Sequence, residues 1–165
     1  MATELTKVEI NKIKEEIAHR QTVVTPQCIA EVQRTRALGD LSENDEYRSA
    51  RRELNRNYSR IRYLQAMLEN AVEVSYASAE DTVGLFDTVT VWDMDEEEES
   101  TVTLVTPLRN DILHNRISKD SPLGSALIGH RVGDQVTVQV NEHYAYTVEI
   151  RALEKGKDDD TLRIN

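Results

Sequence analysis

The stretch Gly-Asp-Leu-Ser-Glu-Asn-Asp-Glu-Tyr, residues 39–47, places four carboxylates within seven residues, directly after a glycine. Glycine readily adopts the left-handed conformation that ends many helices, so Gly39 predicts a helix stop. Ser42 and Asp45 have the spacing of a capping box, which predicts that a second helix begins at once. The stretch therefore predicts an antiparallel helical hairpin with its first two acidic residues at the tip.

The segment before the tip, residues 5–38, has helical periodicity, with isoleucines at positions 10, 13 and 17. Thr25-Pro26 interrupts it and predicts a kink or a short break, with proline near the start of the next helical piece. Beyond this point Ile29, Val32 and Leu38 are expected to continue the apolar side of the helix.

The returning helix, expected over residues 42–74, has the most regular pattern in the chain. Its seam residues recur at spacings of three and four, which is typical of a coiled coil. They are Tyr47, Ala50, Leu54, Asn57, Ile61, Leu64, Leu68 and Ala71. Asn57 is the polar exception, and a buried asparagine can fix the register of two helices. Thirty-odd helical residues predict an arm of about 45–50 Å, and reach is a plausible purpose of such an arm.

Beyond a small and polar linker, residues 76–84, the apolar pattern changes from helical to alternating. Strands are expected at 88–92, 101–105, 135–140 and 144–153, with a short helix from Ser121-Pro122 to Ile128. The acidic stretch 93–100 is expected to be a solvated hairpin connection. The fold class is therefore α+β, with an antiparallel α-helical coiled-coil hairpin over 1–75, a small α+β domain over 85–154 and a mobile acidic tail over 155–165.

The net charge of −10 is unevenly distributed. Residues 1–75 carry 12 basic and 12 acidic residues, whereas residues 76–165 carry 8 basic and 18 acidic residues. Because phosphate contacts dominate nucleic-acid affinity, any RNA contact must be local and in the first half. Cys28 is the only cysteine, which excludes an internal disulfide and a multi-cysteine zinc site. No apolar run or signal-peptide pattern indicates a membrane span or secretion, which predicts a cytoplasmic protein.

A row of arginines lies opposite the seam of the returning helix: Arg48, Arg51, Arg52, Arg56, Arg60 and Arg62. Glu53 is the only acidic residue between positions 48 and 62, so the local charge is +5. One interpretation is a solvated face with pairs inside the helix. The other is a phosphate-binding surface, because the planar donor fork of arginine suits phosphate.

Asp40 and Glu43, three residues apart at an exposed turn, could share a divalent cation such as Mg²⁺, although a partner would have to complete the coordination. The bland alternative is helix capping, since acids favour helix N-termini. The histidines lack metal-ligand spacing, and no phosphate-binding glycine loop or nucleophile elbow is present. An isolated enzyme is therefore not expected.

The run 39–47 resembles the tip signature of the Gre-type (GreA/GreB family) transcript cleavage factors of bacterial RNA polymerase. A second block, residues 117–123 with Leu127-Ile128-Gly129 and Val132-Gly133-Asp134, is similar to the C-terminal domain of that family. The two blocks stand in the family's order and at about its spacing, and the resemblance covers nearly the whole chain. It implies a transcription elongation factor whose C-terminal domain has an FKBP-like fold.

The resemblance also implies how such a chain acts. The hairpin would enter the secondary channel of RNA polymerase, where Asp40 and Glu43 would help to hold Mg²⁺ shared with the polymerase and bound tightly only in that complex. The polymerase would then hydrolyse backtracked nascent RNA by its own activity, which rescues arrested complexes. A monomer without membrane contact is expected. The residues implied at the RNA 3′ end are Arg48, Arg51, Arg52, Arg56 and Arg60, and those implied at the polymerase are Tyr47, Asp120, Ser121 and Pro122.

The residues assigned to polymerase contact also have purely structural explanations. Tyr47 occupies a seam position, where packing is the alternative, and Asp120 to Pro122 can form a helix-starting turn. The chain departs from the family pattern at 51–58, 23–25 and 106–115. These departures leave open a divergent paralogue that binds the channel and regulates or inhibits the polymerase without cleavage. A third alternative is an unrelated coiled-coil scaffold that self-associates through its seam. Proline isomerase activity is not expected, because the second half has few aromatic residues and fold alone does not transfer function.

Overall fold

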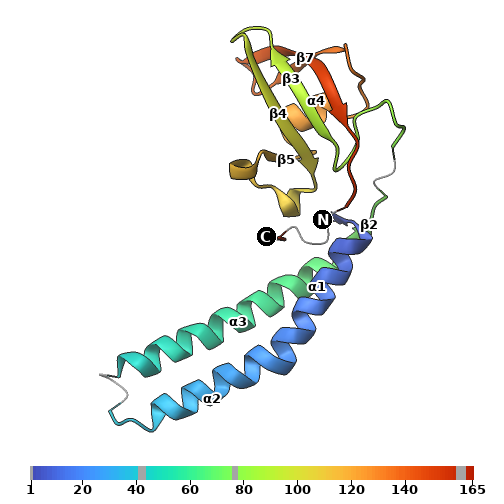
Figure 1. The fold of residues 1–165 in the computed structure, drawn as a ribbon. Helices are drawn as coiled ribbons and strands as arrows, with labels where there is room; N and C mark the ends of the chain where they lie inside the picture. The colour runs from blue at the N-terminus through green and yellow to red at the C-terminus, as the bar shows by residue number, and fades with distance from the viewer. Residues whose placement is uncertain (1, 41–43, 76–77, 159–162) are drawn as a thin grey trace. The chain divides into compact units, whose positions relative to one another are not determined.

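The computed structural model describes residues 2–40, 44–75, 78–158 and 163–165. The chain divides into two compact units, Met1–Glu73 and Val74–Asn165. The first unit is a helical hairpin and the second is a five-stranded sheet with a short helix, which confirms the α+β class (Figure 1). Within the described residues, no helix is both long enough and apolar enough to cross a membrane.

The hairpin unit consists of two arms and a small parallel ribbon. In chain order its elements are β1 (Thr3–Leu5), α1 (Lys7–His19), the π-helix η1 (Arg20–Val24), α2 (Thr25–Arg36), α3 (Asp45–Glu69) and β2 (Ala71–Glu73). Strand β1 pairs in parallel with β2, with Thr3 opposite Ala71 and Leu5 opposite Glu73. The sequence predicted helix at Leu5 and over residues 71–73, because a three-residue strand is too short to show an alternating pattern.

Helix α1 begins at Lys7 because Thr6 and Glu9 form a capping box. The Thr6 main-chain N–H donates to the Glu9 carboxylate at 2.8 Å, and the Glu9 N–H donates to the Thr6 hydroxyl at 3.3 Å. This reciprocal pair satisfies two of the N–H groups that a helix leaves open at its start. The capping box places the helix start two residues later than the predicted Leu5.

The irregularity predicted at Thr25-Pro26 is a π-helix that ends at Val24, directly before these two residues. Proline has no N–H, so it cannot donate to the carbonyl four residues earlier. The Thr25 N–H instead donates to the carbonyl of Arg20, five residues back, and the Thr22 hydroxyl donates to the Ala18 carbonyl at 2.8 Å. The helical arm therefore continues through a wider turn rather than breaking.

The predicted seam of α3 faces the first arm. Ala50, Asn57, Ile61 and Leu64 are buried, and Ile13 of α1 is fully buried. Two predictions for the first arm were wrong: Ile29 and Leu38 are 38% and 58% exposed, while the buried position near the tip belongs to Thr35. Helix α3 has 25 residues, about 38 Å at 1.5 Å per residue, and is shorter than the predicted arm.

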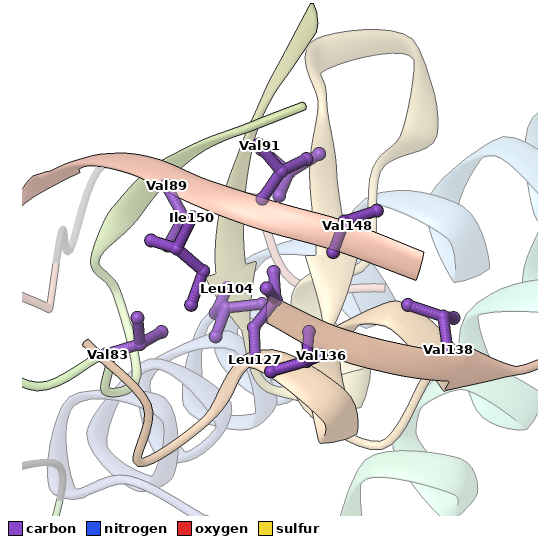
Figure 2. Packing of buried hydrophobic residues seen from close by; sticks show 10 residues of the cluster. Val83, Val89, Val91, Leu104, Leu127, Val136, Val138, Val148 and Ile150 are labelled. Carbon is purple, nitrogen blue, oxygen red and sulfur yellow. The ribbon is translucent and has the colours of Figure 1, made fainter. Parts of the chain in front are cut away.

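The second unit is built on a five-stranded sheet of order β5-β4-β3-β7-β6. Its elements are β3 (Thr88–Asp93), β4 (Glu98–Val105), the 3₁₀ turns η2 (Pro107–Arg109) and η3 (Ile112–His114), β5 (Arg116–Ser118), α4 (Pro122–Leu127), β6 (Gln135–Gln139) and β7 (Ala145–Glu154). Antiparallel pairs join β3 with β4, β3 with β7 and β6 with β7, whereas β5 runs parallel to β4. Alternate residues of the central strands pack with Leu127 of α4 in the core (Figure 2).

Two boundaries of this unit differ from the prediction. Val83, within the predicted linker, is 1% exposed and belongs to the core. The described part of the predicted mobile tail also packs on the unit. Lys155 forms an ion pair with the buried Asp87, Asp158 pairs with Arg109, and the Asn165 N–H donates to the Leu108 carbonyl at 3.0 Å. The tail prediction was wrong for these residues, because their polar groups have buried partners that charge and composition cannot reveal.

Candidate functional site at the hairpin tip

The tip begins where α2 ends at Arg36. Gly39 has a φ of 127°, a conformation that residues with a side chain rarely adopt, so the chain turns there as predicted. Asp40 follows the turn and is exposed. Glu43, together with Leu41 and Ser42, lies outside the described residues, so the pairing of the two predicted tip carboxylates stays a prediction.

The returning helix begins at Asp45, and its N-cap is Asn44. The Asn44 side-chain oxygen accepts a 3.0 Å hydrogen bond from the Tyr47 N–H, and its amide donates to the Thr35 carbonyl at 2.7 Å. The prediction that Ser42 and Asp45 cap this helix was wrong, since Asn44 takes that place. Asparagine is among the preferred N-cap residues and two acids follow it here, so the sequence did contain the signal.

The acids after Asn44 have roles within the hairpin. Asp45 and Glu46 occupy the first turn of α3, where carboxylates are favoured by the helix dipole. Asp45 pairs with Arg48 at 3.5 Å, and Glu46 lies 3.7 Å from Arg34 of α2. All four side chains are about half exposed or more, so these pairs contribute little stability.

The tip offers an incomplete set of metal ligands. Over the described ranges, no three His, Cys, Asp or Glu side chains are grouped so that they could hold a metal ion. Asp40 supplies an exposed carboxylate, which is the ligand type that Mg²⁺ prefers, and Mg²⁺ is often held by only one or two protein carboxylates. One exposed carboxylate does not make a metal site, so Mg²⁺ shared with a partner at Asp40 stays a prediction.

The arginines for which the family resemblance implies contact with RNA lie in different environments. Arg48 and Arg56 pair with acids on their own helix, Asp45 and Glu53. Arg51 lies over the half-buried Tyr47 ring, with its guanidinium carbon 5.8 Å from the centroid. Arg52 is exposed. The exposed face of α3 therefore carries intrahelical ion pairs beside the exposed Arg52, so both interpretations of the arginine row stay open.

Arg60 differs from the rest because it bonds across the hairpin. Its guanidinium donates to the Glu16 carboxylate of α1 at 2.8 and 3.1 Å. Arg20 donates to the same carboxylate at 2.7 Å and also to the Asn57 side chain at 3.1 Å. Two guanidinium groups hold the pKa of Glu16 at about 2, with the Arg60 hydrogen bond as the largest cause.

The buried Asn57 extends this network to Thr25, the first residue of α2. Its amide donates to the Thr25 hydroxyl at 2.6 Å, and its side chain is 3% exposed. The prediction that Asn57 is a buried polar seam residue is confirmed. Its partners Arg20 and Thr25 were not predicted from the sequence, because the facing positions depend on the register of the two arms.

In the second unit, the turn Asp120-Ser121-Pro122 starts helix α4. Ser121 is the N-cap: its hydroxyl accepts from the Gly124 N–H at 3.1 Å and donates to the Ser118 carbonyl at 2.7 Å. The Asp120 side chain is 62% exposed and lies 3.1 Å from the Lys119 ammonium. The helix-starting interpretation is therefore confirmed for Ser121 and Pro122, and a contact between this turn and a partner stays a prediction.

Comparison with known proteins covers both units. The family model "Transcription elongation factor, N-terminal" matches residues 3–72, and "Transcription elongation factor, GreA/GreB, C-term" matches residues 78–155. Transcription elongation factor GreA of Thermoanaerobacter pseudethanolicus is 39% identical over 154 residues, which are 93% of this chain and 96% of the relative. GreA of Oenococcus oeni is 34% identical, again over 154 residues, with 93% and 95% covered.

A solved structure, the GreA factor homolog 1 (Gfh1) of Thermus thermophilus, is 25% identical to the chain. The match covers 94% of this chain and 100% of the solved chain, with a TM-score of 0.44. The family assignment rests on the sequence matches, which span both the hairpin and the sheet unit. The chain therefore belongs to the GreA/GreB family of transcription elongation factors.

Proposed function

We propose that this chain inserts its hairpin into the secondary channel of bacterial RNA polymerase and stimulates hydrolysis of backtracked nascent RNA by the polymerase. The observation that carries the proposal is the exposed Asp40 at the end of a hairpin whose arms are joined near the tip by Asn44 and Thr35. A carboxylate presented on such an arm is suited to complete a site that the partner provides.

Asp40 and Glu43 are the residues that would hold Mg²⁺ together with polymerase carboxylates. The bound ion would help to activate water and stabilise the displaced oxygen, as in other two-metal sites. The hairpin contributes position: the Asn44 cap fixes the start of α3, and the Glu16–Arg60 bonds join the arms farther back. The hydrolytic activity belongs to the polymerase, which shortens the transcript and restarts elongation.

The other implied residues are assigned to the substrate and the partner. Arg48, Arg51, Arg52 and Arg56 would contact the extruded RNA 3′ end by charge, with Arg60 restricted by its bonds to Glu16. Tyr47 at the tip and the Asp120-Ser121-Pro122 turn would contact the polymerase. The chain would act as a monomer, since one hairpin fills one channel.

A second candidate function is channel binding without stimulation of cleavage. The pairing of Arg48, Arg56 and Arg60 with carboxylates favours it, because these guanidinium groups are partly neutralised for contact with RNA. In this case the hairpin would occupy the channel and regulate or inhibit the polymerase.

RNA cleavage in a stalled, backtracked polymerase complex separates the two candidates when binding is measured in the same samples. The first predicts shorter transcripts with the wild-type protein and a loss of cleavage, but not of binding, in Glu43→Gln. The second predicts binding by both proteins and no shortening by either. A wild-type protein that does not bind the polymerase would contradict both.

A further inference from the structure

Two large apolar side chains with high exposed fractions lie on one turn of the sheet unit. Ile112 and Leu113, in η3, are 73% and 93% exposed. Single exposed apolar residues are common on soluble proteins, whereas an adjacent pair on a projecting turn is a candidate contact for another protein. Figure 1 shows the short helical turns beside β5 projecting from the edge of the sheet.

The turn that carries this pair is held on both sides. Asp111 and Arg116 exchange two main-chain hydrogen bonds of 2.9 Å, and Asn115 between them is left-handed with a φ of 57°. The Asp111 carboxylate also bonds the His114 ring at 2.6 Å, which lowers the pKa of Asp111. Because the backbone is already fixed, burying Ile112 and Leu113 against a partner would cost little conformational entropy.

A basic pocket lies at the base of the same turn. It has a volume of about 240 Å³ and is lined by Arg109, Asn110, Asp111, Arg116, Arg163 and Asn165. Residues 76–165 carry only 8 basic against 18 acidic residues, and three of those eight line this one pocket. Arg109 is fully buried and paired with Asp158, and Arg116 lies 3.6 Å from Asp111. The exposed Arg163 is therefore the side chain that favours a partner with a carboxylate there.

The turn and pocket are continuous with the loop proposed to contact the polymerase. The Asn110 side chain, which lines the pocket, accepts a 3.1 Å hydrogen bond from the Ser118 N–H. Ser118 in turn accepts from Ser121, the N-cap of α4. Arg163 and Asn165, which complete the pocket, lie beyond residues 78–155 matched by the C-terminal family model.

We infer that Ile112, Leu113 and the arginine pocket form a second docking surface for RNA polymerase. The inference rests on the proposed function and names the chemistry of the partner: an apolar recess that receives the two side chains, bordered by a carboxylate that faces the exposed Arg163. The surface extends the Asp120-Ser121-Pro122 contact along the edge strand β5.

The test compares polymerase binding by the full chain and three variants. Ile112→Ser with Leu113→Ser is expected to weaken binding by roughly 10- to 100-fold, as for central apolar contacts in other interfaces. Arg163→Glu is expected to weaken it several-fold, and less so at high salt. Val132→Ser is the matched control, because Val132 is a 52% exposed apolar residue in another loop. Thermal unfolding should be the same for all four proteins, since the changed side chains are exposed.

The inference is overturned if the double serine variant and Arg163→Glu both bind the polymerase as tightly as Val132→Ser does. If the wild-type protein still binds and stimulates cleavage in that case, the proposed function stands without it. If the wild-type protein does not bind the polymerase, the proposed function fails, and the inference fails with it.

Discussion

The side-chain amide of Asn44 donates a 2.7 Å hydrogen bond to the main-chain carbonyl of Thr35, so one side chain caps α3 and also joins it to the end of α2. Asn44→Ala removes both bonds and is expected to lower the free energy of unfolding by about 1–3 kcal/mol. Asn44→Ser keeps an N-cap oxygen but has no amide donor, so about half of the loss should return. Urea unfolding and amide exchange of residues 35–47 provide the measurement, and equal stability of the alanine variant and the wild type would contradict this role.

The Glu16 carboxylate should stabilise the hairpin in a pH-dependent way. Its pKa in the folded protein is about 2, below the ordinary 4.5, because Arg60 and Arg20 bond to the charged form. A depressed folded pKa contributes stability that is fully present above pH 4.5 and is lost as pH falls toward 2. Glu16→Gln is therefore expected to cost roughly 1–3 kcal/mol at pH 7 and much less at pH 3.

Urea unfolding of Glu16→Gln at pH 7 and pH 3 measures this difference, with Glu15→Gln as the control. Glu15 is the exposed neighbour on the same helix, so its substitution should change stability by less than about 0.5 kcal/mol at either pH. A loss in Glu16→Gln that does not depend on pH would contradict the ionic explanation.

Alanine substitutions of Arg60 and Arg52 should distinguish an arginine that stabilises the hairpin from one that is proposed to contact RNA. Arg60→Ala leaves the partly buried Glu16 with one guanidinium fewer and should destabilise the hairpin by roughly 1–3 kcal/mol. Arg52→Ala removes an exposed side chain and should leave stability within about 0.5 kcal/mol, while it weakens crosslinking of the α3 face to the RNA 3′ end. Equal effects of the two substitutions on stability would show that the Arg60–Glu16 pair does not hold the arms together.

The ion pair of Arg109 with Asp158 should fasten the C-terminal residues to the sheet unit. The two side chains are 0% and 1% exposed. Removal of one partner leaves a buried charge uncompensated, so Asp158→Asn is expected to cost about 3–5 kcal/mol. Glu154→Gln, the same chemical change at an exposed position, is the control for thermal unfolding. Proteolysis near residue 158 should also become faster in Asp158→Asn only, and similar proteolysis of both variants would contradict the fastening role.

Features with a regular sequence pattern could be predicted from the sequence alone. The three-four spacing of Ala50, Ile61 and Leu64 predicted the seam of α3, and alternation predicted the β3 and β4 strands within a few residues. The glycine stop at position 39 was also predictable, because its left-handed φ follows from a local preference. Local signals of this kind need no knowledge of the partner segment.

Features set by distant partners could not be predicted. Strand β5 has three residues, and its place in the sheet depends on parallel pairing with β4. The bonds from Glu16 to Arg60 and from Asn57 to Thr25 depend on the register of the two arms, which the π-helix alters. The acids of the C-terminal segment suggested a solvated tail, yet Asp158 is buried because Arg109 faces it from η2.

The most direct test of the central claim is the single-turnover rate of RNA cleavage in a backtracked polymerase complex, measured across Mg²⁺ concentrations. Asp40→Asn should lower the rate by about 10- to 100-fold and require more Mg²⁺. Asp45→Asn, the same change in the first turn of α3, should stay within about twofold of the wild type, because the proposal assigns no Mg²⁺ contact to Asp45. If Asp40→Asn cleaves at the wild-type rate with the same Mg²⁺ dependence, the tip carboxylate does not take part in cleavage and the account is contradicted.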